Sequence, residues 1–565
     1  MQPPRPLDST VVGDRQTGGP SDRRALIFLF LVTLAGTAPF LDQAFHIDDE
    51  VYLRLARDLV DSPTTFLAGS APLFGRETPL VDHTQHPPLT LAFLGLLRWG
   101  LGRTSEVPFH AAYAGFAFLA VYGLLRLLRR LTPHGFELCL LIAVSPPFVV
   151  SAHTLMTDVP FLAFFVLALD AFLELLETAT PAAAARAAVL ASLCALTQFR
   201  GLLLPVVVLA YACATGQGSR RLALAALLPF GALTLVEVTA RHLWGVSPFL
   251  RSAGFLALTG DRLLLSAVTY LAALGGCLGF LVIAVVDRVS WRRWALVAPI
   301  GALAVLSHRR QMDTVNLVLG VLYATAGLVL VYDLIRSGTT TAVAVLRRRR
   351  PDPDPNPLVS LLGVAVLASL VVMGLFACVR NLLVLIPLLV VAFVHEYPEL
   401  LRPRRLTVAA GLSAALALAC SASDYAWAGA YRAYARQYAE RPGIYFTGEW
   451  GFRYYMERSG ARYLLASRQD LPDGAVVVRP EIAAPENRLD PRLERRLRPL
   501  ADEALPGPLP LVLMSRPPRN CGWYSEGYGV LPFCVGRLMQ ERFVRYEVAG
   551  EEVAQPRAEA ATWPR

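Results

Sequence analysis

Apolar residues occur along this chain in blocks of roughly 15–23, and short connectors that carry arginine separate the blocks. A block of that length is typical of a helix that crosses a hydrocarbon core ~30 Å thick. The pattern predicts about thirteen membrane-spanning helices, at residues 25–44, 107–128, 136–155, 159–177, 184–198, 201–216, 222–243, 264–286, 294–307, 315–335, 358–377, 382–397 and 406–422. We therefore predict an all-α polytopic membrane domain over residues 25–422.

Two regions depart from this pattern. Residues 45–106 are polar and too long for a simple turn, and residues 51–59 place their apolar positions on one helical face. This predicts a first outer loop with helices that lie in the membrane interface. Residues 423–565 have a mixed composition, in which GAVVV at 474–478 and LPLVLM at 509–514 have the pattern of buried strands. They predict a small C-terminal α/β domain.

The arginines indicate the orientation of the helices. Connectors that carry Arg126, Arg129 and Arg130, or Arg402, Arg404 and Arg405, fall on one side, which the distribution of basic residues assigns to the cytoplasm. Arg309 and Arg310 are an exception to this assignment. Residues 1–24, rich in Pro, Gly, Asp and Ser, then form a disordered cytoplasmic tail, and an odd number of spans places residues 423–565 outside.

Composition narrows the class of protein. The chain of 565 residues is 55% hydrophobic, with a mean hydropathy of +0.46 and 17% charged residues, where a soluble chain carries about 25%. This excludes a secreted disulfide scaffold, a disordered chain and, despite the net charge of +9, a nucleic-acid-binding protein. All 53 basic residues are arginine, so any bound anion must be held by arginine, histidine or backbone groups.

The first outer loop carries three adjacent carboxylates, Asp48, Asp49 and Glu50, at the start of its first predicted helix. Carboxylates are favoured at a helix N-terminus, so capping is one explanation. The other is a general base that takes the proton from an attacking hydroxyl. Further along the loop, His83 and His86 have the spacing HxxH beside Asp82, which suits either a weak metal site or structural hydrogen bonds, and we favour the latter.

Three more ionisable residues lie at predicted outer ends of spans. Asp158 begins the fourth span, Arg200 lies between the fifth and sixth, and Arg380 lies between the eleventh and twelfth. An ionisable group at membrane depth is a functional candidate, although a carboxylate also caps a helix and an arginine also reaches the interface from within a span. Because one topology places all three on the side of Asp48 and Asp49, the set suits a substrate with a phosphate and a hydroxyl.

The C-terminal region holds Cys521 and Cys534, while the other six cysteines lie in or beside spans. In an oxidising compartment these two either pair, which would stabilise the fold by about 3 kcal/mol, or remain thiols.

The outer-loop motifs carry a family resemblance. Asp49, Glu50 and Tyr52 match a DE pair followed by tyrosine, His86 to Leu89 match a K/H-P-P-L element, and Thr157 to Pro160 match T-D-x-P. Arg380 and Pro387 loosely match a late R-Y-L-L-P-like element. The chain resembles, over residues 25–535, integral-membrane glycosyltransferases of the GT-C fold, specifically bacterial relatives of protein O-mannosyltransferases and of the lipid A aminoarabinose transferase. The segments FTGEWGFRYYMERSG (446–460) and WYSEGYGVLPF (523–533) resemble parts of bacterial transferases of this kind.

The resemblance implies a polyprenyl-phosphate sugar as donor, inversion at the anomeric carbon, and a hydroxyl on a glycan, lipid or protein as acceptor. It implies Asp49 as the base, with Asp48 as an alternative, and Asp158 as a second catalytic carboxylate. Substrate contacts would come from five residues: Glu50, Tyr52, His86, Arg200 and Arg380. It implies no metal or other cofactor, and it implies a bacterial inner membrane with residues 423–565 in the periplasm.

The chain departs from the family at two positions. Relatives often have a lysine where Gln198 stands and a tyrosine where Asn381 stands. Arg200 is therefore the candidate substitute for that lysine. Two other classes of protein compete with the enzyme: a transporter or flippase of lipid-linked sugars, which would more often show an internal repeat, and a membrane scaffold whose outer domain binds a partner.

Overall fold

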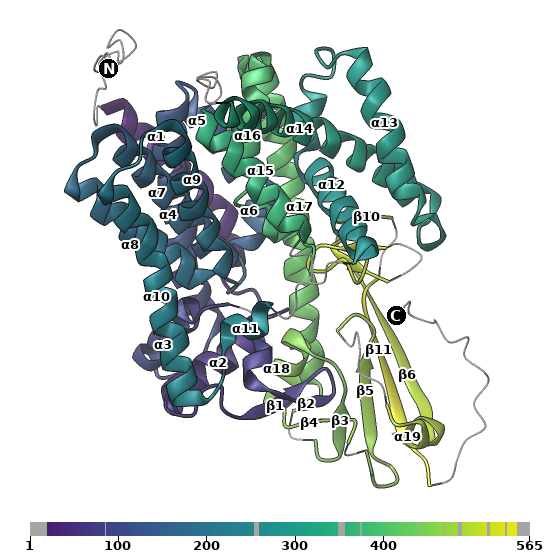
Figure 1. Cartoon of the computed structure of the whole chain (residues 1–565). Coiled ribbons are helices and arrows are strands. Elements are labelled where there is room, and N and C mark those ends of the chain that lie inside the picture. The colour runs from purple at the N-terminus through teal and green to yellow at the C-terminus, as the bar shows by residue number, and fades with distance from the viewer. Residues whose placement is uncertain are drawn as a thin grey trace, which may run out of the picture.

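The computed structural model describes residues 20–84, 86–253, 259–347, 356–372, 376–439, 441–467, 469–483, 489–516, 520–536 and 539–550. It is a helical bundle with a smaller sheet-containing region at one end (Figure 1). The helices of the bundle are α1 Pro20–Thr37, α4 Glu106–Leu131, α5 Gly135–Ala143, α6 Pro146–Ser151, α7 Asp158–Thr178, α8 Pro181–Thr197, α9 Leu203–Thr215, α10 Arg220–Trp244, α12 Gly260–Ile283, α13 Trp291–Leu306, α14 Thr314–Leu346, α15 Pro357–Val372, α16 Ile386–Glu396 and α17 Pro403–Arg436.

Seven segments are long and apolar enough to cross a membrane, and five shorter apolar helices accompany them in the part of the chain that the structure describes. The predicted polytopic helical domain is thus confirmed, and the predicted spans other than 136–155 coincide largely with helix. The span predicted at 136–155 differs, because it consists of two short helices, α5 and α6, joined at Val144 and Ser145. Pro146 and Pro147 explain this break, since proline lacks an N–H and disfavours helical geometry in the residue before it.

The predicted first outer loop contains two helices and a hairpin. Helix α2 spans Asp49–Asp61, α3 spans Leu89–Leu101, and strands β1 Ser70–Leu73 and β2 Arg76–Pro79 pair antiparallel between them. They lie together with the short helices α11 Pro248–Ala253 and α18 Trp450–Arg458 at the end of the bundle opposite the start of α1 (Figure 1). Short 3-10 turns at Phe199–Leu202 and Val379–Leu382 carry Arg200 and Arg380.

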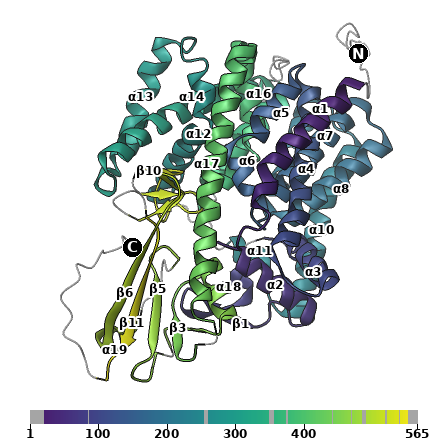
Figure 2. The ribbon, with the colours of Figure 1, turned by 180° about the vertical axis from the view of Figure 1, so that it is seen from behind.

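Helix α17 is continuous through residue 422, where the composition of the chain changes. Figure 2 shows it running the height of the molecule from the bundle to the sheet. Trp427, Tyr431 and Tyr434 on its last turns are buried, because the C-terminal region packs on this part of the same helix. The apolar core is accordingly shared between the bundle and the C-terminal region.

The predicted C-terminal α/β region is confirmed. Its main sheet has the strand order β4-β3-β5-β11-β6, in which β3 is parallel to β4 and β5, and β11 is antiparallel to β5 and β6. These strands are β3 Ile444–Phe446, β4 Arg462–Tyr463, β5 Val476–Pro480, β6 Leu497–Pro506 and β11 Met539–Val548, with α19 Pro491–Arg496 before β6. Smaller pairs join β7 Leu511–Val512 to β10 Cys534–Val535, and β8 Met514–Ser515 to β9 Cys521–Gly522.

The smaller pairs lie against the bundle. The ring of Phe533 contacts Tyr323 of α14, and a Cβ placed at Gly276 of α12 would meet Pro532 at 2.6 Å. Cys521 and Cys534 are both buried here and no disulfide joins them in the structure. Residues 1–19 of the predicted tail, and residues 551–565, lie outside the described residues, whereas α1 already begins at Pro20.

Candidate active site

The first turn of α2 points its two leading carboxylates in different directions. The Asp49 side chain is fully buried, and its oxygens accept hydrogen bonds from the backbone N–H of Leu155 at 2.8 Å and of His46 at 3.2 Å. The Asp48 side chain is 37% exposed, and although it stands at the N-cap it makes no capping hydrogen bond. Asp48 is thus open to a ligand, while Asp49 holds the outer loop against the connection between α6 and α7.

Arg380 joins two of the predicted catalytic carboxylates. Its Nη2 donates to Asp48 Oδ2 at 3.2 Å, and its Nη1 lies 3.7 Å from Asp158 Oδ2. Nη1 also contacts the sulfur of Met156. The Arg380 and Asp158 side chains are 14% and 7% exposed, so this is a largely desolvated cluster, in which charge interactions are stronger than in water. One guanidinium therefore links the starts of α2 and α7.

A second row of polar groups continues from Asp158. Gln198 donates through Nε2 to Asp158 Oδ1 at 3.2 Å, and its Oε1 accepts from Arg200 Nη2 at 3.0 Å. The same Arg200 nitrogen lies 2.7 Å from Asn381 Oδ1, and Asn381 Nδ2 donates to Tyr270 OH at 3.3 Å. Gln198 and Asn381 thus fix Arg200 beside the cluster.

Tyr52 and His86 complete the cluster. The buried Tyr52 hydroxyl bonds to the Thr157 side chain, and burial and the Asp48 charge raise the pKa of this phenol. The His86 ring is within the electrostatic range of Asp158, Arg200 and Arg380, and burial lowers the pKa of His86 to about 4. A neutral imidazole therefore lines the cluster at physiological pH, and it is able to donate or accept one hydrogen bond without adding charge.

Glu50 belongs to a separate network. Its Oε1 lies 3.5 Å from Arg54 Nη1, and it is within electrostatic range of Glu449 and Arg453 of the C-terminal region. Arg54 also donates to His83 Nδ1 at 2.8 Å, while His83 Nε2 bonds to Thr78 at 2.7 Å. Both ring nitrogens of His83 therefore serve hydrogen bonds, as the structural interpretation of the HxxH pair predicts. Among the described residues, Glu50 therefore pairs within α2 and interacts electrostatically with the start of α18, not with Arg380.

A buried network behind Asp49 escaped the sequence reasoning. His46 is fully buried, with Nε2 2.9 Å from Asp424 Oδ2 and Nδ1 3.7 Å from Asp49 Oδ2. Burial alone would lower the pKa of His46, but Asp424 and Asp49 outweigh it and raise this pKa to about 10. Asp424 Oδ2 also accepts from Tyr524 OH at 2.9 Å. An imidazolium thus ties the start of α2 to α17 and the C-terminal region, and the only local signal was an aspartate within an apolar helix.

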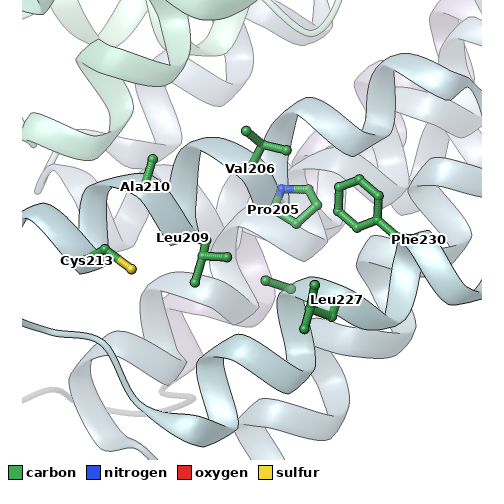
Figure 3. Close-up of a pocket in the computed structure, with 8 residues that line it drawn as sticks. Pro205, Val206, Leu209, Ala210, Cys213, Leu227 and Phe230 are labelled. Atoms are coloured by element: carbon green, nitrogen blue, oxygen red, sulfur yellow. The ribbon is translucent and has the colours of Figure 1, made fainter.

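An apolar groove lies apart from these groups, between α9 and α10 (Figure 3). It has a volume of about 300 Å³ and is lined by Pro205, Val206, Leu209, Ala210, Cys213, Ala226, Leu227 and Phe230. The lining offers no polar surface, so the groove suits a hydrocarbon chain and carries no chemistry of its own. No cluster of three or more His, Cys, Asp or Glu residues with the arrangement of a metal site occurs in the described residues.

Comparisons with known proteins give distant likenesses. No protein-family model matches the chain, and no curated protein matches it. Among solved structures it is similar to the oligosaccharyltransferase of Archaeoglobus fulgidus in the apo form, with a TM-score of 0.44 and 14% identity, over 80% of this chain and 65% of that chain. This chain thus spans less than two thirds of the length of that enzyme.

Two further solved structures are similar over most of the chain. One is ArnT from Cupriavidus metallidurans bound to undecaprenyl phosphate, with a TM-score of 0.40 and 13% identity, over 95% of this chain and 99% of that chain. The other is AglB from Archaeoglobus fulgidus with an inhibitory peptide and a dolichol-phosphate, with a TM-score of 0.46 and 14% identity, over 86% of this chain and 73% of that chain. These likenesses are distant, so the functional proposal rests on the site itself.

Proposed function

We propose that the protein is a membrane glycosyltransferase that moves a sugar from a polyprenyl-phosphate donor to an acceptor hydroxyl on the outer side of a bacterial inner membrane. The observation that carries this proposal is the Arg380 guanidinium between Asp48 and Asp158, at the ends of apolar helices. Arginine binds phosphate in a charge-assisted and often bidentate manner. A carboxylate beside that arginine is in the right place to accept a proton from a hydroxyl that attacks near the phosphate.

The exposures of the aspartates support a division of roles. Asp48 is the base, because its carboxylate is 37% exposed and, among the described residues, pairs with Arg380 alone. Asp49, fully buried with two backbone donors, positions the turn that carries Asp48. Asp158 is 7% exposed and is fixed by Gln198, which suits a carboxylate that orients the acceptor and balances the arginine charge.

The reaction then follows from these contacts. The donor phosphate binds Arg380 and Arg200 and competes with Asp48 for the guanidinium, which frees the Asp48 carboxylate for the acceptor hydroxyl. The acceptor oxygen forms a bond to the anomeric carbon, the bond from that carbon to the phosphate oxygen breaks, and the acceptor proton passes to Asp48. The lipid phosphate leaves with its electron pair on the side opposite to attack, so the configuration inverts. Tyr52 and the neutral His86, which border this cluster, hydrogen-bond the donor.

The test is the release of lipid phosphate by the purified full-length protein in lipid nanodiscs. Undecaprenyl-phosphate hexoses and pentoses serve as donors, and released undecaprenyl phosphate is measured by chromatography for wild type, Asp48→Asn and Asp158→Asn. Asp58→Asn is the matched control, because Asp58 lies on the same helix and pairs with Arg57 at 3.1 Å. General-base catalysis contributes typically 10²–10⁴-fold, so Asp48→Asn should slow release by about that factor. Release by Asp48→Asn at the wild-type rate would overturn the role of the base, and no release by wild type from any donor would overturn the function.

A further inference from the structure

The segment Trp523–Tyr528 of the C-terminal region lies against the turn that carries Arg380. The backbone N–H of Val379 donates to the Trp523 carbonyl at 3.0 Å, and the N–H of Glu526 donates to the Ala377 carbonyl at 3.1 Å. These two bonds lie immediately before Arg380 in the chain. A stretch from the sheet-containing region therefore forms part of the wall of the candidate active site.

Aromatic residues on either side of Glu526 hold this segment in place. Trp523 is fully buried, Tyr524 donates to Asp424 at 2.9 Å, and Tyr528 donates to the Ile482 carbonyl at 2.6 Å. Their contacts anchor the segment to α17 and to the residues that follow β5. Glu526 lies in the turn between the two tyrosines, on the side of the segment that meets Ala377.

The Glu526 carboxyl has an unused acceptor in a buried place. The backbone N–H groups of Glu526 and Ala377 orient it, but its Oε2 is buried without a hydrogen-bond partner in the described part of the chain. Burial raises the pKa of Glu526 to about 7, although the positive charge of the exposed Arg262 acts to lower it. A buried acceptor with no partner is unfavourable in the empty protein, and a ligand that donates a hydrogen bond would satisfy it.

Tyr270 connects Glu526 to the phosphate-binding row. It is within electrostatic range of both Glu526 and Arg200, and its hydroxyl accepts from Asn381, which itself accepts from Arg200. The order along the wall is thus Arg200, Asn381, Tyr270 and Glu526. The arginine end attracts a phosphate, whereas the carboxyl end repels it and accepts hydrogen bonds from hydroxyl groups.

We propose that Glu526 is a specificity-determining residue that accepts hydrogen bonds from hydroxyls of the sugar carried by the donor. This inference rests on the proposed function, and it assigns the sugar part of the donor to the C-terminal region and the phosphate part to Arg380 and Arg200. The contact discriminates a sugar-carrying lipid from the bare lipid phosphate, which is also the product. The C-terminal region is thereby a component of the active site.

The test compares two ligands. Equilibrium binding of undecaprenyl phosphate and of undecaprenyl-phosphate mannose, glucose and arabinose is measured for the full-length protein in nanodiscs, without acceptor. Glu526→Gln should weaken binding of the sugar-carrying lipid that wild type prefers by roughly tenfold and leave binding of undecaprenyl phosphate within about twofold. Glu526→Asp should be intermediate, and Glu547→Gln, an exposed residue on β11, should bind both ligands as wild type does.

Each other outcome has a distinct meaning. If Glu526→Gln and wild type bind the preferred sugar-carrying lipid equally, the inference is overturned and the proposed function stands. The same holds if wild type binds no sugar-carrying lipid more tightly than undecaprenyl phosphate. Loss of both ligands in Glu526→Gln indicates a structural role and also overturns it. Failure of wild type to bind undecaprenyl phosphate overturns the proposed function itself.

Discussion

Asp48 and Asp49 are adjacent, yet their substitution should affect different properties. In wild type, the two Asp49 oxygens accept from the backbone N–H groups of Leu155 at 2.8 Å and His46 at 3.2 Å. Asp49→Asn keeps one acceptor oxygen but replaces the other with an amide NH₂, so one of these backbone N–H groups loses its acceptor. It also removes the charge beside the His46 imidazolium at 3.7 Å in a fully buried place. An unsatisfied buried donor costs about 1–3 kcal/mol, and breaking a buried ion pair costs about 3–5 kcal/mol. We therefore expect the free energy of unfolding to fall by about 3 kcal/mol, near the low end because Asp424 remains beside His46.

Asp48→Asn should behave in the opposite way. Asp48 makes no capping hydrogen bond, is 37% exposed, and leaves Arg380 with Asp158 as a partner, so its removal should change stability by less than about 1 kcal/mol. Its loss should instead slow sugar transfer by about 10²–10⁴-fold.

Unfolding and turnover are measured on the same preparations. Unfolding in detergent is followed by tryptophan fluorescence over temperature and denaturant, and turnover by release of undecaprenyl phosphate. Asp58→Asn is the control in both assays. If Asp49→Asn unfolds as wild type does but releases no lipid phosphate, then Asp49 is the base and the division of roles is refuted.

Three other perturbations test separate parts of the structure. The pKa of His46 is raised to about 10 from an ordinary 6.5, so its charge stabilises the fold fully below pH 6.5. This stabilisation is lost as the pH rises to about 10. The unfolding midpoint should therefore fall over that interval in wild type, and fall less in His46→Gln. Gly451→Ala should destabilise the protein, because its Cβ would meet the Phe45 carbonyl oxygen at 1.9 Å, whereas Gly429→Ala, with nothing within 4 Å, should not; equal unfolding midpoints would contradict this. Arg380→Lys should weaken binding of undecaprenyl phosphate by roughly tenfold, since an ammonium does not reproduce the bidentate fork of a guanidinium. Arg57→Lys is the control, and binding by Arg380→Lys that is unchanged from wild type would exclude Arg380 as the phosphate ligand.

The positions of the helices followed from the sequence, because the length of an apolar block determines whether it spans a membrane. That Asp48, Asp158, Arg200 and Arg380 lie at the same end of the bundle was also predictable, since a single topology places all four on one side of the membrane. The break at Ser145 had a visible signal in the two prolines that follow it, which the hydropathy pattern alone concealed.

The direction of each side chain was beyond the sequence. Asp48 and Asp49 are about 100° apart on one helical turn, and which of them faces Arg380 depends on the distant backbone of Leu155 and on His46. The His46–Asp424–Tyr524 contacts join residues from three remote parts of the chain, so no local spacing of residues predicts them. The place of Glu526 depends likewise on backbone bonds between segments far apart in sequence.

The backbone bonds that join Ala377 and Val379 to Glu526 and Trp523 have a consequence for biosynthesis. The ribosome synthesises residues 523–526 after every helix of the bundle. The site around Arg380 is therefore complete only after the C-terminal region has been made and has folded back against α12. A nascent chain that is still being inserted therefore has an incomplete site, and it should release no lipid phosphate from a donor already present in the membrane.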